Sequence, residues 1–251
     1  MLETKNLTIR FGGHVAVDHV SCAFTPGTLT AIVGPNGAGK TTYFNLISGQ
    51  LRASEGSVHL NGVDITHQAA SARTHAGLGR AFQLTQLFPN LSVVENVRLA
   101  VQSRRKQGLN LWSVWLDQRA TLDRAMELVT RVKLADRADA HASSLPHGDQ
   151  RKLEVAMLMA LEPSVYMFDE PTAGMSVDDV PVILDLIRAL KRETDKTILL
   201  VEHKMDVVRE LADRIIVLHN GQLVADGEPA TVIASKVVQE AYLGITVEEP
   251  A

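Results

Sequence analysis

The 251-residue sequence lacks several features that characterise other classes of protein. Its single cysteine, Cys22, excludes a framework of internal disulfides and suits a reducing compartment. No apolar run approaches the ~18 residues needed to span a bilayer, and the N-terminus lacks a secretory signal pattern. The net charge of −4 gives no reason to expect nucleic acid as the main partner. We therefore expect a soluble, cytoplasmic protein that reaches a membrane only through a partner.

Apolar residues make up 45% of the sequence, which is ample for a buried core. In the first part of the chain these residues form short runs, separated by turn signals such as Gly12-Gly13 and Pro26-Gly27. We expect strands at residues 2–9, 16–24, 29–33 and 57–60. Cys22 falls within the second of these runs, where a small core residue is expected rather than a reactive thiol.

The pattern changes after Pro89. Residues 92–161 contain no convincing strand, and their apolar residues keep helical spacing. Beyond residue 161, strands and helices are expected to alternate, with strands at 165–168, 197–201 and 215–218 and helices between them. A hairpin turn is expected at Asn220-Gly221. Ser176 and Asp179 have the spacing of a capping box for the first of these helices. The pattern predicts an α/β nucleotide-binding core (1–89 and 162–238), an inserted helical subdomain (90–161) and a tail (239–251).

The strongest motif is GPNGAGKTT at residues 34–42, directly after the apolar run 29–33. Its glycines allow backbone N–H groups to surround an anion, and the next helix directs its positive N-terminus at phosphates. Lys40 would reach the β- and γ-phosphates of ATP, and the Thr41 hydroxyl would ligate Mg²⁺. A glycine-rich turn without function is the alternative, but the strand before and the helix after favour nucleotide binding. The candidate residues are Gly34, Pro35, Asn36, Gly37, Ala38, Gly39, Lys40, Thr41 and Thr42.

A second motif is the apolar run 165–168 followed by Asp169 and Glu170. Carboxylates at the C-terminal edge of a parallel sheet lie where ligands bind in α/β folds. Asp169 would hold Mg²⁺, directly or through water, and Glu170 would polarise the attacking water. Two acids that only end a strand are the alternative, and the P-loop pattern upstream favours the catalytic interpretation.

With these motifs in this order, the sequence resembles the ATPase subunits of ABC transporters over essentially its whole length. The resemblance implies an ABC-type ATPase fold with an N-terminal antiparallel β part. It also implies that Phe11 stacks on adenine, although a core phenylalanine is the alternative. Gln83 matches the Q-loop glutamine that senses Mg²⁺ and the γ-phosphate beside the transmembrane partner. Residues 173–176 match the D-loop at a dimer interface, and His203 matches the switch histidine that contacts the γ-phosphate.

The signature motif departs from the family's Leu-Ser-Gly-Gly-Gln. Here it reads Leu145, Pro146, His147, Gly148 and Asp149. The usual hydroxyl is missing at Pro146, and Asp149 adds negative charge where a partner's γ-phosphate would approach. Because family sites combine one subunit's P-loop with the other's signature, this change is expected to weaken the site on the partner and to favour a heterodimer. The alternative is that Asp149 is simply a helix cap.

Residues 83–97 (QLTQLFPNLSVVENV), together with RKLEVA, DEPTAGMS and AYLG, resemble the larger ATPase subunit of branched-chain amino-acid importers. Relatives in that group carry urea, short amides or aromatic acids. The resemblance implies a second ATPase subunit, two transmembrane permeases, a periplasmic binding protein that acts indirectly, and a peripheral location on the cytoplasmic face of the membrane. The apolar run 87–89 near Gln83 is the expected contact with a permease.

Two other functions stay open at this point. Soluble ABC proteins that act on ribosomes or DNA usually carry both ATPase halves in one chain, whereas this chain has one P-loop and one signature. A nucleotide-binding module that does not hydrolyse ATP would not need Lys40, Asp169, Glu170 and His203 together.

Overall fold

The computed structural model describes residues 1–81, 87–104, 114–236 and 238. Contacts divide the chain into two compact units. The first comprises Met1–Leu78, Ser164–Glu170 and Lys191–Ala251, and the second comprises Gly79–Pro163 and Pro171–Leu190. The predicted subdomain at 90–161 lies within the second unit, which also takes in residues 171–190. Gln83 lies outside the described residues.

An antiparallel sheet of order β2-β1-β4-β5 forms one side of the first unit. Its strands are β1 (Leu2–Phe11), β2 (His14–Phe24), β4 (Glu55–Leu60) and β5 (Val63–Asp64). Along β2 and β4, buried residues alternate with more exposed ones, because one face of this sheet covers the core. The predicted strands at 2–9, 16–24 and 57–60 are confirmed, and Cys22 is buried. The sequence did not reveal β5, whose two residues are exposed.

The second sheet has the order β10-β9-β3-β8-β7-β6. Its strands are β3 (Leu29–Val33), β6 (Leu78–Ala81), β7 (Val165–Asp169), β8 (Thr197–Val201), β9 (Arg214–His219) and β10 (Gln222–Gly227). β3 lies between β8 and β9 and is parallel to both. All residues of β3 and β8 are buried, which explains why both strands read as continuous apolar runs. The predicted hairpin at Asn220-Gly221 joins β9 to the antiparallel β10, and both turn residues have positive φ.

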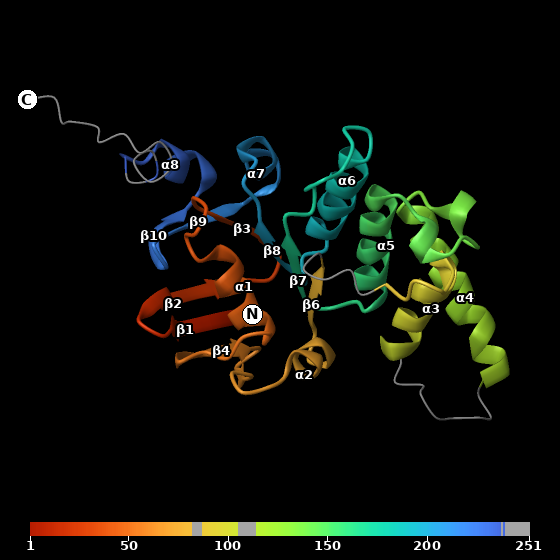
Figure 1. Cartoon of the computed structure of the whole chain (residues 1–251), viewed down its shortest axis with the longest axis horizontal. Coiled ribbons are helices and arrows are strands. Elements are labelled where there is room, and N and C mark those ends of the chain that lie inside the picture. The colour runs from red at the N-terminus through yellow and green to blue at the C-terminus, as the bar shows by residue number, and fades with distance from the viewer. Residues whose placement is uncertain (82–86, 105–113, 237, 239–251) are drawn as a thin grey trace, which may run out of the picture. The chain divides into compact units, whose positions relative to one another are not determined.

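Helix α1 (Lys40–Ser48) fills the space between the two sheets (Figure 1). Its residues Tyr43, Phe44, Leu46 and Ile47 belong to a core cluster that also contains buried residues of β1, β2, β3 and β9. On the other side of β3 and β9, a second cluster includes residues of α7 (Met205–Leu211) and α8 (Pro229–Ala234). The helix that follows the phosphate-loop motif is therefore held firmly by the fold.

A buried arginine anchors the C-terminal end of α1. Arg73, on the short helix α2 (Ala70–His75), is 2% exposed. Its Nη1 donates to the carbonyls of Leu46 (2.7 Å) and Ile47 (2.6 Å), its Nη2 to that of Thr66 (2.7 Å), and its Nε to that of Gln68 (3.1 Å). Burial lowers the pKa of Arg73, and the Asp64 carboxylate opposes this effect. Arg73 thus gives a side-chain donor to two carbonyls in the last turn of α1, where a helix has few backbone donors left.

We expect Arg73→Met to lower the free energy of unfolding by about 3–5 kcal/mol, because each buried carbonyl that loses its donor costs about 1–3 kcal/mol. Arg192→Met makes the same chemical change at an exposed position and serves as the control. Urea unfolding of both variants measures the difference. A loss below about 0.5 kcal/mol in Arg73→Met would contradict this role.

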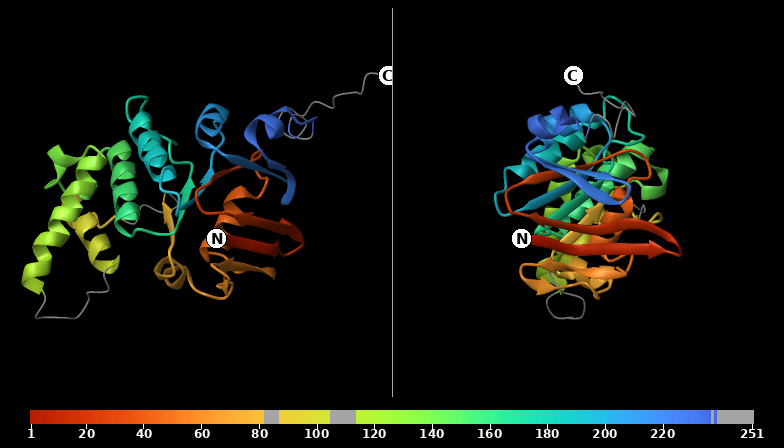
Figure 2. Two further views of the ribbon diagram at one scale, coloured as in Figure 1. Left: turned by 180° about the vertical axis from the view of Figure 1, so that it is seen from behind. Right: turned by 90° about the vertical axis from the view of Figure 1, so that its left-hand side faces the viewer.

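The second unit is built mainly from helices (Figure 2). Helices α3 (Val93–Arg104), α4 (Val114–Arg131) and α5 (His147–Ala160) pack on one another, and α6 (Val180–Lys191) follows β7 in the chain. In the described part of 92–161 no strand occurs, as predicted, although Ser92 and His141 form an isolated β-bridge. The described helices include none long and apolar enough to cross a membrane.

Candidate nucleotide-binding site

Strand register brings the predicted catalytic motifs to one edge of the second sheet. Ile32 of β3 pairs with Val201 of β8, and Val201 pairs with Asp169 of β7. The residues that come next in each chain segment therefore emerge at the same edge, which is the carboxyl edge where α/β folds bind ligands. These residues are the loop that begins at Gly34, Glu170, and the Glu202-His203 pair.

The loop at 34–39 approaches neighbouring backbone so closely that only glycine fits at two positions. Gly34 has φ +150°, and a Cβ there would lie 2.1 Å from the carbonyl oxygen of Leu218. Gly39 has φ +96°, and a Cβ there would lie 2.5 Å from the carbonyl oxygen of Ala16. Gly34 and Gly39 are therefore required by the close packing of the loop, and they also leave backbone N–H groups accessible.

Lys40 begins α1 with its ammonium group inside this loop. The Nζ donates to the carbonyls of Gly34 (2.7 Å) and Pro35 (2.9 Å), and the residue is 8% exposed. Burial lowers the pKa of Lys40, while the Glu170 and Asp169 carboxylates act in the opposite direction. Gly39, at the N-cap, supplies no side-chain cap. The first turn of α1 thus combines helix N–H groups and a desolvated cation, a combination suited to phosphate.

Glu170 adopts a backbone conformation that is rare outside glycine. Its φ is +49°, and its amide donates to the Val201 carbonyl at 2.9 Å. Such a conformation costs roughly 1–3 kcal/mol and persists only where the surroundings impose it. The side chain remains 43% exposed. The bond to β8 therefore holds an accessible carboxylate at the sheet edge, where a strained residue is typical of a functional site.

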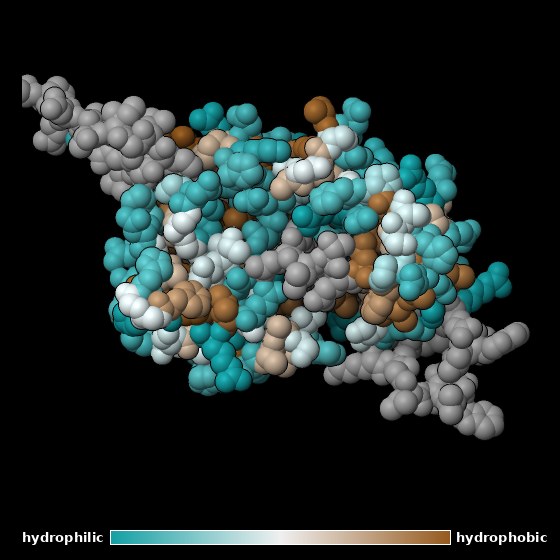
Figure 3. All heavy atoms as spheres, viewed as in Figure 1, coloured by the Kyte–Doolittle hydropathy of each residue, from teal (hydrophilic) through white to brown (hydrophobic). Residues whose placement is uncertain are grey.

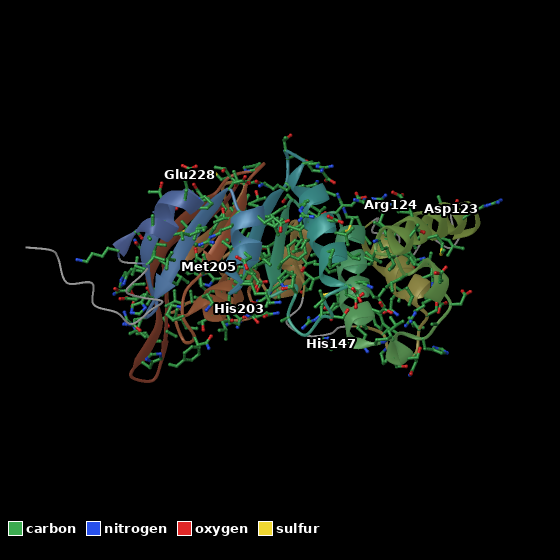
Figure 4. All side chains as sticks on the ribbon, turned by 90° about the horizontal axis from the view of Figure 1, so that it is seen from above. Asp123, Arg124, His147, His203, Met205 and Glu228 are labelled. Atoms are coloured by element: carbon green, nitrogen blue, oxygen red, sulfur yellow. The ribbon has the colours of Figure 1, made fainter. Side chains whose placement is uncertain are left out.

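His203 lies beside Glu170, with 3.6 Å between its Nδ1 and Glu170 Oε1. His203 follows β8, and Figure 4 shows it near Met205, the first residue of α7. Glu202 is fully buried, and its Oε1 accepts the amides of His203 (2.9 Å) and Lys204 (3.1 Å). Glu202 thereby fixes the turn that presents His203. No role for Glu202 was predicted from the sequence, although its position between an apolar strand and the histidine was the available signal.

Thr41, Asp169 and Phe11, which were also predicted to bind MgATP, lie in the first unit. Thr41 is exposed in the first turn of α1, and Asp169 ends β7. Phe11 is 50% exposed at the end of β1, opposite His14. Among the described residues, no group of three His, Cys, Asp or Glu side chains is arranged to hold a metal. One hydroxyl and one carboxylate still suit Mg²⁺, which commonly takes few protein ligands and completes its shell with phosphates and water.

The structure of the signature turn in the second unit contradicts one of the two sequence interpretations of Asp149, that it caps a helix. Helix α5 begins at His147 after Pro146, and no side chain caps it. The Asp149 carboxylate instead pairs with Arg137 Nη1 (2.9 Å) and Lys152 Nζ (3.0 Å). The helix-cap interpretation is therefore wrong, and the charge expected to act on a partner's phosphate is not isolated.

The capping box predicted from Ser176 and Asp179 does not form at the start of α6, which begins at Val180. Ser176 Oγ donates to Asp179 Oδ2 at 2.7 Å, so the two side chains bond each other rather than backbone amides. Asp179 also pairs with Lys152. The prediction is wrong because an ion pair from another helix competes for the same carboxylate.

Comparison with known proteins gives a consistent result. The family model described as "ABC transporter" matches residues 17–173. The high-affinity branched-chain amino acid transport ATP-binding protein LivG of Escherichia coli K12 is 35% identical, with 97% of this chain and 98% of LivG aligned. A nucleotide-free ATP-binding cassette from an ABC transporter superposes with TM-score 0.82 at 29% identity, covering 98% of this chain and 99% of that one. A dimeric post-hydrolysis cassette bound to ADP and Pi has TM-score 0.79 at 25% identity, covering 91% and 99%.

Proposed function

The chain belongs to the ABC transporter family of ATPases, and we propose that it powers a membrane importer for branched-chain amino acids. The observation that carries this proposal is the similarity to LivG. It extends over 97% of this chain and is therefore not confined to the nucleotide-binding motifs. Importers of urea, short amides or aromatic acids are the alternative. A soluble ABC ATPase that acts on ribosomes or DNA is the alternative from another class.

We assign MgATP to the sheet edge described above. Lys40 and the N-terminus of α1 would bind the phosphates, and the Phe11 ring would stack on adenine. Thr41, Asp169 and Gln83 would hold Mg²⁺, which neutralises phosphate charge in phosphoryl transfer. Glu170 would orient and deprotonate the attacking water, and His203 would contact the γ-phosphate. The 3.6 Å approach of His203 to Glu170 supports a shared role for these two side chains.

We propose that the chain works as one half of a dimer with a second, different ATPase subunit. The signature turn, 145–149, would then face ATP held by the partner. Val177, in the loop before α6, is 88% exposed, and such an apolar residue is suited to a protein contact. The dimeric cassette among the similar structures supports a dimer, and the altered signature at Pro146 and Asp149 is the reason to propose that the two subunits differ.

Two permeases would complete the complex on the cytoplasmic face of the membrane, and a periplasmic binding protein would deliver the substrate to them. The surface proposed for the permease contact is a cavity of about 400 Å³ in the second unit, whose lining includes Leu87, Phe88, Leu99 and Met157. Phe88 is half exposed, and its backbone is bonded in both directions to the side chain of the buried Asn96 (2.8 and 3.1 Å). Figure 3 shows apolar residues gathered on the surface of this unit.

Cysteines at Leu87 or Phe88 are expected to crosslink to a cytoplasmic loop of a permease, because Asn96 holds this apolar segment at the surface. Val63→Cys is the matched control, since Val63 is 59% exposed on β5 in the other unit. The native Cys22 is buried and should stay unreactive. Mass spectrometry of crosslinked complexes makes the comparison. Equal crosslinking of the Val63→Cys and Phe88→Cys variants to the permease would show that this surface is not the docking site.

Copurification tests the proposed function at the level of class and substrate. Tagged chain drawn from its native membranes should retain hydrophobic permeases and a second ATPase subunit, whereas recovery of ribosomes would support the alternative class. The binding protein encoded beside this chain should bind leucine, isoleucine or valine by calorimetry. Preference for urea, amides or aromatic acids would redirect the substrate assignment and leave the ATPase role intact.

A further inference from the structure

Four charged residues link the signature turn to the loop before α6. Lys152, one turn after Asp149 on α5, has a side chain that is 9% exposed and pairs with both Asp149 and Asp179. Arg137 pairs with the other oxygen of Asp149, at 2.9 Å. Ser176 donates to the remaining oxygen of Asp179, at 2.7 Å. We call Arg137, Asp149, Lys152 and Asp179 the Lys152 cluster.

The Lys152 cluster contains two cations and two anions, so its formal charge is zero. Burial alone would lower the pKa of Lys152, but its bonds to Asp179 and Asp149 outweigh burial, and the pKa is raised. Bonds from Lys152 and Ser176 lower the pKa of Asp179. Lys152 and Asp179 therefore stay charged across the neutral range, and Lys152 offsets negative charge at the first turn of α5.

The backbone of the same turn also contacts the loop before α6. A Cβ at Gly148 would lie 2.7 Å from Asp179 Oδ2, so the α5 backbone abuts this carboxylate. A Cβ at Gly174 would lie 3.5 Å from the ring of His147, which begins α5 (Figure 4). The ion pair thus joins segments that already touch, and Lys152 is the side chain that spans them.

We propose that Lys152 is a positioning residue, which holds the loop 174–179 against the signature turn and cancels the charge that Asp149 brings to that turn. The proposal rests on the proposed function, in which the signature turn faces the partner's ATP. Without Lys152, the remaining cluster would carry a net charge of −1 beside the γ-phosphate and would repel it. The loop would also lose its connection to α5. An ion pair with a purely structural role would affect the loop but would not change the affinity for ATP.

Hydrogen exchange of the isolated chain tests the positioning role without reference to any partner. The amides of Asp179 and Val180 both bond to the Ser176 carbonyl (3.1 and 3.2 Å) and report on this loop. We expect Lys152→Met to speed their exchange about tenfold, a change of about 1.4 kcal/mol in local opening. Lys152→Arg should exchange as wild type does. Lys196→Met removes a lysine paired with Asp195 elsewhere and is the control. Unchanged exchange in Lys152→Met would overturn the positioning role.

Asp179→Asn provides a second route to the same result if Lys152→Met does not fold. It leaves Lys152 paired with Asp149 and weakens only the connection to the loop. The same amides should exchange faster in this variant. Protection equal to wild type would overturn the proposal.

ATP kinetics in the assembled complex test the charge effect. Glu170→Gln in this chain silences its own site, so turnover reports the partner's site. Lys152→Met should then raise KM for ATP by about tenfold, and adding Asp149→Asn should restore KM because the cluster is neutral again. The double variant should still show fast exchange in the loop, which separates charge from position. Unchanged KM in Lys152→Met, or no recovery in the double variant, would overturn the charge role. An inactive wild-type complex would instead count against the proposed function.

Discussion

Replacing Lys40 with alanine should lower the affinity for MgATP by roughly 10²-fold. A charge-assisted bond is worth about 1.5–3 kcal/mol, and Lys40 is desolvated in the loop that would hold the phosphates. Isothermal calorimetry on the wild-type and variant chains measures the affinity. Affinity within threefold of wild type would refute the assignment of the phosphates to this loop.

Lys40 also donates to the carbonyls of Gly34 and Pro35, so the variant needs a structural control. Lys40→Arg keeps the charge and changes its shape, which tests whether a point cation or a planar group fits this loop. Thermal unfolding of both variants without nucleotide shows whether the loop itself is damaged. A loss of ATP affinity much larger than any loss of stability assigns the effect to phosphate binding.

Glu170→Gln should bind ATP with nearly wild-type affinity and hydrolyse it about 10²–10⁴-fold more slowly. Glutamine preserves the shape of the side chain and its Cβ, so the positive φ of residue 170 is disturbed no more than in wild type. What is lost is the base. Single-turnover hydrolysis in a complex whose partner site is disabled isolates this step.

The control for Glu170→Gln is Glu228→Gln, which makes the same chemical change at an exposed position before α8 (Figure 4). The control variant should hydrolyse ATP at the wild-type rate. A hydrolysis rate for Glu170→Gln within threefold of the wild-type rate would show that Glu170 is not the catalytic base. His203 would then be the next candidate to test, because its Nδ1 lies 3.6 Å from Glu170 Oε1.

Much of the first unit follows from local sequence. The strands β3, β7 and β8 are buried on both faces and read as apolar runs, so they could be predicted together with the motifs at their C-terminal ends. Short elements such as β5, β6 and α2 were not predicted, because so few residues do not show a recognisable hydrophobic periodicity. The strand β6 also contains Gly79 and Arg80, which obscure its apolar pattern.

The residues that sequence reasoning misjudged have partners far along the chain. Asp149 was expected to bring negative charge toward a partner's phosphate or to cap a helix, and the sequence did not indicate that Arg137 and Lys152 pair with it. Arg73 received no role, because its acceptors on α1 are 26 and 27 residues away in the chain. Local sequence patterns identify the side chains that would contact a ligand. The ion pairs and hydrogen bonds that neutralise or position such side chains depend on the tertiary fold.

The most direct test of the account is ATP-driven uptake by the complete transporter in proteoliposomes. The vesicles would contain this chain, its partner ATPase and the permeases, with the binding protein outside and ATP inside. We predict uptake of labelled leucine that requires internal ATP, exceeds uptake of urea, and falls by at least about tenfold with Glu170→Gln. Leucine uptake that persists at the wild-type rate with Glu170→Gln, or a complex that hydrolyses ATP without importing any branched-chain amino acid, would contradict the account.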